Sequence, residues 1–198
     1  YWAGADEHVR RLEDRIGQVK HVYVEMIDRG GEEGAHLTEQ ISPGAGKLVA
    51  SRLKQGATFE ALEDPETLAE TMDWERCLLG GLASRKAADY VSQAYSDASR
   101  RRYEFIAKRF EESLQEGEAG LAILTEHHRV QFPPSIRVFY VAPPALDEVH
   151  RWLRDYREQA RAPKAEATTE PEEEQPEGGA EPGKEESAEQ GEETKQEE

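Results

Sequence analysis

The sequence has one cysteine, Cys77, among 198 residues, and it has no long apolar run. A single thiol cannot form an intramolecular disulfide or a cysteine-based zinc site. No stretch approaches the ~20 consecutive apolar residues that a transmembrane helix needs, and no signal peptide is visible. We therefore expect a cytoplasmic protein that does not enter a membrane. Because the first residue is Tyr1 rather than Met, we also expect that a native N-terminal strand is missing.

Basic residues are scarce relative to acidic ones. The chain contains 25 Lys and Arg against 42 Asp and Glu, which gives a formal net charge of −17. Residues 163–198 hold fourteen Glu and three Lys, a balance of −11, so −6 remains for residues 1–162. No basic stripe interrupts this excess, and an acidic chain repels phosphate. Nucleic acid is therefore excluded as an expected partner.

Residues 162–198 lack aromatic residues, Leu, Ile and Val entirely. Such a segment cannot bury enough apolar surface to offset the entropy lost on ordering. We predict one domain over residues 1–161 and a disordered Glu-rich tail over 162–198. A block of like charges is typical of interaction tails, so this tail is suited to contact a basic protein.

The first 161 residues contain alternating strand and helix patterns. Strands separated by helices predict an α/β layered domain with a mostly parallel sheet flanked by helices. The expected helices are 1–17, 32–41, 43–55, one starting at Pro65, 82–116, and one starting at Pro144. The expected strands are 19–27, 57–62, 119–125 and 136–142, and the continuous apolar run at 119–125 predicts a strand covered on both faces. Leu79 is expected on the apolar side of the helix that starts at Pro65, Tyr90 on the buried side of 82–116, and the last helix is expected to bury an inner side.

Ligands of such sheets gather at the carboxyl ends of the strands. That rule directs attention to 25–34, 59–64 and 125–129. Glu60 is a strand-end carboxylate, suited to act as a base or a metal ligand. His127 and His128 are adjacent, and adjacent side chains on a strand point to opposite faces. At most one of the two histidines therefore faces the edge, and either can equally be an ordinary residue where a strand ends.

Several segments resemble a family of uncharacterised prokaryotic proteins, and more distantly the TraB/PrgY/GumN (TIKI-like) group. They are GATFEALEDPE (56–66), RRYEFIAKRFEESLQEGEAGLAIL (101–124) and the HRV that follows at 128–130. The resemblance implies a metal-dependent hydrolase site. In it, His128 matches the histidine of a Gly-x-x-His motif, and Glu60 matches a strand-end acid. Thr125 stands at the glycine of that motif, and Tyr103 replaces the acid or amide that follows Arg102.

Two functions remain open at this point. The first is a hydrolase-like site, intact or degenerate through the departures above, with His128, Glu60 and Arg102 as catalytic residues. There a divalent metal would be held by His128, Glu60 and Glu25. The second is a non-catalytic binding or sensing domain on the same scaffold, which the departures at Thr125 and Tyr103 favour.

Overall fold

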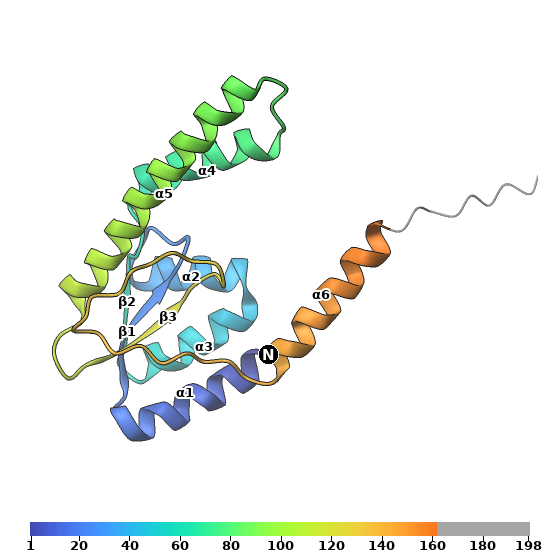
Figure 1. Ribbon diagram of the computed structural model, residues 1–198. Coiled ribbons are helices and arrows are strands. Elements are labelled where there is room, and N and C mark those ends of the chain that lie inside the picture. Colours follow the sequence, from blue (N-terminus) through green and yellow to red (C-terminus); the bar gives the residue numbers. More distant parts are fainter. Residues whose placement is uncertain (162–198) are drawn as a thin grey trace, which may run out of the picture. The chain divides into compact units, whose positions relative to one another are not determined.

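A computed structural model describes residues 1–161 (Figure 1). Helices alternate with the strands of a parallel sheet, which confirms the predicted α/β class. The predicted disordered tail, 162–198, lies outside the described residues. The helices are α1 (Trp2–Ile16), α2 (Gly31–Ile41), α3 (Pro43–Lys54), α4 (Pro65–Leu79), α5 (Arg85–Ser113) and α6 (Ala145–Arg161). The strands are β1 (Val19–Val24), β2 (Thr58–Glu60) and β3 (Ala119–Ile123).

The sheet has the order β2-β1-β3, and both pairings are parallel. In this register Val22 of the central strand lies between Phe59 and Leu121. All three side chains are buried on one face of the sheet, together with residues of α1 and α3. In Figure 1, α1, α2 and α3 lie on this side of the strands. This face supplies most of the apolar core that holds the sheet.

The opposite face of the sheet packs against α5. Tyr23 of β1 is 1% exposed, and its ring meets the ring of Phe110 edge-on, with 4.7 Å between centroids. Its hydroxyl lies 2.8 Å from the Ser113 hydroxyl, and burial raises the pKa of the phenol. Because side chains alternate along a strand, His21 and Glu25 point to this same face. The α5 face therefore carries His21 and Tyr23 of β1, and Glu25 directly after the strand.

A buried arginine joins α1 to α3. The side chain of Arg52 is fully buried, and its guanidinium contacts the carboxylates of Asp6 and Glu13, the latter at 3.1 Å. Its Nε is a buried atom without a hydrogen-bond partner. A buried charge is tolerated only when it is paired, so α1 is fixed by ionic as well as apolar contacts.

The predicted strand at 136–142 is wrong. These residues have no strand hydrogen bonding in the structure. Two of their branched side chains contact separate apolar clusters instead: Ile136 packs on the α5 side of the sheet and Val141 on the other, while Val138, Phe139 and Tyr140 are exposed. The apolar pattern thus reflects a segment that crosses between two clusters. The strand at 119–125 was expected to be covered on both faces. In the structure it is β3, an edge strand in which only Leu121 is buried.

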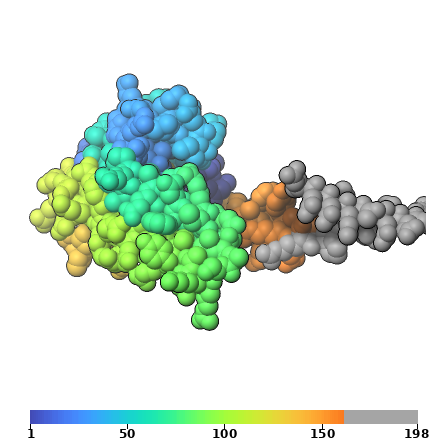
Figure 2. Space-filling view, turned by 90° about the horizontal axis from the view of Figure 1, so that it is seen from above, coloured from blue at the N-terminus to red at the C-terminus, as the bar shows by residue number. Residues whose placement is uncertain are grey.

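Two helical assignments also need correction. The long helix starts at Arg85 rather than Leu82, because the Ser84 side chain accepts a hydrogen bond from the backbone of Ala87. Leu79 and Tyr90 were expected on buried sides and are 80% and 70% exposed. Leu79 is the last residue of α4, and Tyr90 lies near the start of α5. These two helices pack against each other and extend beyond the sheet in Figure 1, and Figure 2 shows the same green segments from above.

The last helix also differs from the prediction. It was expected to bury an inner side, yet no residue at 145–160 of α6 is buried. No helix within residues 1–161 is both long enough and apolar enough to cross a bilayer.

Candidate functional site

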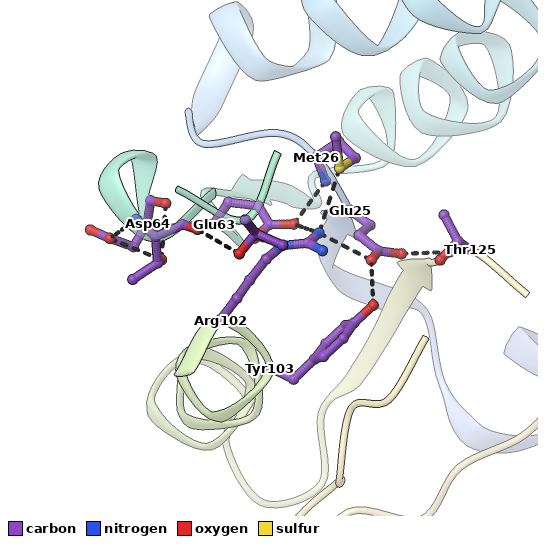
Figure 3. Close-up of polar contacts among 9 residues, drawn as sticks. Glu25, Met26, Glu63, Asp64, Arg102, Tyr103 and Thr125 are labelled. Carbon is purple, nitrogen blue, oxygen red and sulfur yellow. Dashed lines mark hydrogen bonds and ion pairs between the residues drawn. The ribbon is translucent and has the colours of Figure 1, made fainter. Parts of the chain in front are cut away.

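A buried ion network occupies the carboxyl edge of the sheet (Figure 3). Glu25 follows β1, Glu63 follows β2, and Arg102 reaches them from α5; the three residues are 7%, 3% and 6% exposed. Arg102 Nε donates to Glu63 Oε2 at 2.8 Å, and Nη2 donates to Glu25 Oε1 at 3.0 Å. Nη2 also contacts Glu63 Oε1, so the guanidinium grips Glu63 with two nitrogens. We call Glu25, Glu63 and Arg102 the edge network.

Backbone and hydroxyl donors complete the edge network. The amide of Met26 donates to Glu63 at 2.9 Å, and the amide of Thr125 donates to Glu25 at 2.6 Å. The hydroxyl of Tyr103 donates to Glu25 at 3.4 Å. Each carboxylate therefore accepts three hydrogen bonds. These bonds join the ends of all three strands to α5.

The surroundings of the edge network keep Arg102 charged and Tyr103 neutral. Burial by itself lowers the pKa of Arg102, but hydrogen bonding to Glu63 and the charges of both carboxylates outweigh burial, so the pKa lies above its ordinary value. Burial raises the pKa of the Tyr103 hydroxyl, and the charge of Glu25 adds to the effect. At neutral pH, Arg102 is thus a cation and Tyr103 a neutral donor. Two carboxylates and one guanidinium leave a formal charge of −1.

One nitrogen of Arg102 remains available at this edge. Among the described residues Nη1 has no hydrogen-bond partner, and it is not among the fully buried atoms that lack one. Beside it, Met26 is 41% exposed and has a φ of 70°. A non-glycine residue in the left-handed region costs about 1–2 kcal/mol, and such strain is concentrated at functional sites. The strained residue Met26 and the unpaired Nη1 of Arg102 therefore lie at the same part of the surface.

Glu60 belongs to a different polar cluster. Its carboxylate lies 2.9 Å from His21 Nδ1 and 3.7 Å from Arg109. The other ring nitrogen of His21 lies 3.2 Å from Glu118. A hydrogen bond from the Gln115 amide, followed by the contact with His21, lowers the pKa of Glu118. The structure thus pairs Glu60 with His21 and Arg109, and not with Arg102 or His128 as the hydrolase hypothesis requires.

His128 has a local structural role in the loop after β3. Its Nδ1 accepts a hydrogen bond from the amide of Val130 at 3.3 Å, and its ring meets Phe132 edge-on at 6.1 Å. Its own amide donates to the carbonyl of Thr125 at 3.1 Å, which closes a turn. No hydrogen bond or ion pair of the described residues joins His128 to Glu25, Glu60 or Arg102. His127 is exposed.

The residues do not fit the metal implied by the resemblance. Within residues 1–161, no group of three or more His, Cys, Asp or Glu side chains is placed to hold a metal ion. His128, Glu60 and Glu25, the predicted ligand set, are each engaged by different protein partners. Of the predicted residues, the structure brings Glu25 and Arg102 together and leaves Glu60 and His128 apart.

Sequence reasoning placed Glu63 in the strand end at 59–64 but preferred Glu60, and it missed His21. Glu63 lies three residues beyond Glu60, outside the strand, where the alternation of strand side chains no longer predicts direction. His21 sits in mid-strand, away from the edge where ligands are expected. His21 pairs with Thr58, and Glu60 lies two residues further along β2 on the same face of the sheet. This proximity depends on the register of two parallel strands, which cannot be read from one sequence.

Comparisons with known proteins add no relative. No protein-family model, no curated protein and no solved structure matches the chain. The resemblance to the TraB/PrgY/GumN group therefore stays a prediction.

Acid should weaken the start of α4, beside the edge network. Asp64 accepts hydrogen bonds from the amide of Thr67 at 2.9 Å and from its hydroxyl at 3.0 Å, and these bonds, the backbone one first, lower its pKa below 3.8. The stability gained is present above pH 3.8 and is lost as pH falls through the lower folded pKa. Asp64→Asn keeps a capping oxygen and removes the titration.

We therefore expect the urea midpoint of the wild-type protein to fall more between pH 7 and pH 3 than that of Asp64→Asn. Equal falls in the two proteins would show that the cap does not titrate as described.

Proposed function

We propose that this chain is a non-catalytic binding domain whose contact surface is the carboxyl edge of the sheet. The observation that carries the proposal is the engagement of the edge network: each carboxylate already accepts three hydrogen bonds, out of about four that its lone pairs can accept. A general base needs a lone pair directed at its substrate, and a metal ligand needs an accessible oxygen. Glu25 and Glu63 each keep one lone pair, on a residue that is only 7% or 3% exposed.

The groups left at the edge suit recognition by hydrogen bonding. Nη1 of Arg102 is held in a fixed direction, because Nε and Nη2 are bound by the two glutamates. Met26 adds an exposed, polarisable thioether beside it. A donor whose direction is fixed in advance loses little entropy when it binds an acceptor.

The charge of the edge network indicates the kind of acceptor. Its formal charge of −1 repels a second anion in a partly desolvated setting. A neutral acceptor, such as the carbonyl of an amide, is therefore favoured over carboxylate or phosphate. Two hollows of the described residues lie away from this edge, one beside α1 and Pro143–Pro144 and the other along α3. A ligand that binds at the carboxyl edge therefore contacts an open surface. A polypeptide is a ligand that suits such a surface.

Nuclear magnetic resonance of the ¹⁵N-labelled full chain tests this proposal. The probe is a mixture of N-acetylated, C-amidated dipeptides, and the reporters are the amides of Met26 and Thr125. We expect both resonances to shift in the wild type and in the control Arg101→Lys. In Arg102→Lys the shifts should disappear, because lysine keeps the cation and lacks the outward nitrogen.

Shifts that persist unchanged in Arg102→Lys, or no shifts in the wild type, would overturn the proposal. Release of acetate or of a free carboxyl end from the probes would also overturn it, because it would show hydrolysis.

A further inference from the structure

The end of the hairpin that α4 and α5 form is exposed without interruption. Every residue from Leu79 to Lys86 is exposed, and none of them belongs to either apolar core cluster. Leu79, at 80%, is the most exposed large hydrophobic side chain of the described residues, and Leu82 is exposed as well. We call residues 79–86 the hairpin tip. In Figure 1 the hairpin tip lies at the end of α4 and α5 that points away from the sheet.

The charges at the hairpin tip are positive. Residues 76–88 include three basic residues and no acidic one, in a chain whose formal net charge is −17. One of them, Arg76, is paired with Asp73 at 2.6 Å. The other two, Arg85 and Lys86, begin α5, and helical side chains lean toward the N-terminus of their helix, so these two lean past the tip. The side chain of Arg85 is 96% exposed.

The nearest acidic side chains lie behind the hairpin tip. Glu75 precedes Leu79 by four positions, and Asp89 follows Arg85 by four, which is about 6 Å along each helix. Glu75 also leans away from the tip, because α4 ends there. Asp89 lies 4.0 Å from Arg85 in a highly exposed pair, and such pairs are weak. A flat anionic surface at the tip therefore meets the cations before it meets the acids.

Folding does not account for the two cations at the start of α5. Arg85 and Lys86 occupy the first turn of a 29-residue helix, which contains no acidic residue in that turn. Cations are disfavoured at this positive end of the helix dipole, where acidic residues are favoured. Residues that oppose local stability are concentrated at functional sites. A negatively charged partner accounts for the presence of both cations.

Two aromatic residues lie behind the hairpin tip at a common depth. Trp74 and Tyr90 pack edge-on with 6.4 Å between ring centroids, and Tyr90 is 70% exposed. Each is five positions from the nearer helix end, which is about 7–8 Å along its helix. Trp and Tyr are enriched at the level of lipid headgroups, and interfacial helices enter a bilayer by about 5–10 Å. The order of leucine, cation and aromatic residue thus matches the depth profile of a bilayer surface.

The negative charge of the rest of the chain does not prevent a contact at the hairpin tip. Arg85 precedes Arg102 of the edge network on the same helix, and the separation is about 25 Å at 1.5 Å per residue. The Debye length is about 8 Å at physiological ionic strength. Charges around the sheet are therefore largely screened from a surface that the tip contacts.

We propose that the hairpin tip docks on an anionic lipid bilayer. Leu79 and Leu82 enter the boundary between headgroups and acyl chains, and Arg85 and Lys86 contact the lipid headgroups. The expectation that the protein does not enter a membrane rested on the absence of a long apolar run, which is needed to cross a bilayer and not to dock on its surface. No residue of the edge network lies in the tip, so this proposal stands or falls independently of the binding function proposed above.

Flotation of the full chain with lipid vesicles tests the docking. The vesicles contain either equal parts of phosphatidylcholine and phosphatidylserine or phosphatidylcholine alone. We expect the wild type to float with the phosphatidylserine vesicles, less so at high salt, and not with phosphatidylcholine alone. Arg85→Glu/Lys86→Glu should lower the partition coefficient by about 25-fold or more, since each basic residue near an anionic surface contributes roughly fivefold. Leu79→Ser should lower it by about fivefold.

Two variants away from the hairpin tip are the matched controls. Arg100→Glu/Lys108→Glu makes the same change in net charge at two exposed positions of α5. Ile41→Ser removes an apolar side chain that is 70% exposed at the end of α2. Both controls should float as the wild type does. Circular dichroism shows whether each variant is folded, and Arg85→Gln/Lys86→Gln replaces the glutamate variant if that one does not fold.

The single cysteine reports where the chain contacts the vesicle. Cys77 is exposed and lies two residues before Leu79. A polarity-sensitive fluorophore on its thiol should shift its emission to the blue with phosphatidylserine vesicles. Flotation without this shift, or equal effects of the tip variants and their controls, would overturn the proposal. So would a wild type that does not float, whether the tip is then free or covered by a protein.

Discussion

Replacing Arg102 by methionine should lower the free energy of unfolding by about 3–5 kcal/mol. The substitution leaves Glu25 and Glu63 buried, 7% and 3% exposed, without the cation that compensates them. It also removes one or more hydrogen bonds from each carboxylate. Urea denaturation followed by circular dichroism measures the loss.

Arg101→Met is the matched control for this prediction. Arg101 is the preceding residue and is also paired with a glutamate, Glu70, at 2.6 Å, but both side chains are more than 40% exposed. Exposed pairs contribute little to stability, so the control should unfold near the wild-type midpoint. The triple variant Arg102→Met/Glu25→Gln/Glu63→Gln should recover part of the loss. Equal losses for Arg101→Met and Arg102→Met would contradict the description of a buried network.

Replacing Arg52 by methionine should also cost about 3–5 kcal/mol, and the loss should be concentrated at α1. Arg52 is fully buried, and it is the cation that compensates Asp6 and Glu13 beneath α1. Without it, two carboxylates lose their buried partner, and α1 should exchange its amide hydrogens faster than α3 does. Hydrogen exchange read by mass spectrometry separates this local effect from general unfolding.

Arg10→Met provides the control for Arg52. Arg10 contacts the same carboxylate, Asp6, but its side chain is 63% exposed. We expect near-normal exchange of α1 in this variant. If Arg10→Met loosens α1 as much as Arg52→Met does, burial of Arg52 is not what fixes the helix.

The parts of the fold with local signals were predictable from the sequence. The Asp64-Pro65 start of α4 is a capping residue followed by proline, and the structure has that cap. The segment 136–142 was not predictable, because branched residues favour an extended backbone whether or not a neighbouring strand is present. Ile136 and Val141 pack on two separate apolar clusters, and the backbone of the segment forms no strand hydrogen bonds. Strand pairing is a property of the whole fold, which a local pattern cannot supply.

The candidate site shows the same division between local and non-local information. Glu25 and Arg102 were identified because one follows a strand and the other belongs to a quoted motif. Their contact spans 77 positions, and the sequence does not show that Glu63 rather than Glu60 completes it. Both glutamates lie near the end of β2, but the chain turns after Glu60, and only the turned backbone carries Glu63 to Arg102. His128 matched a motif position, yet its nitrogen is used within its own loop.

We propose that the carboxyl edge holds an ion network rather than a metal-dependent site. The most direct test is the metal content of the full chain after incubation with Zn²⁺ or Mn²⁺ and removal of excess ion, measured by inductively coupled plasma mass spectrometry. We predict substoichiometric metal in the wild type and the same amount in His128→Ala and Glu60→Gln. One metal ion per chain, lost in either variant, would contradict the account.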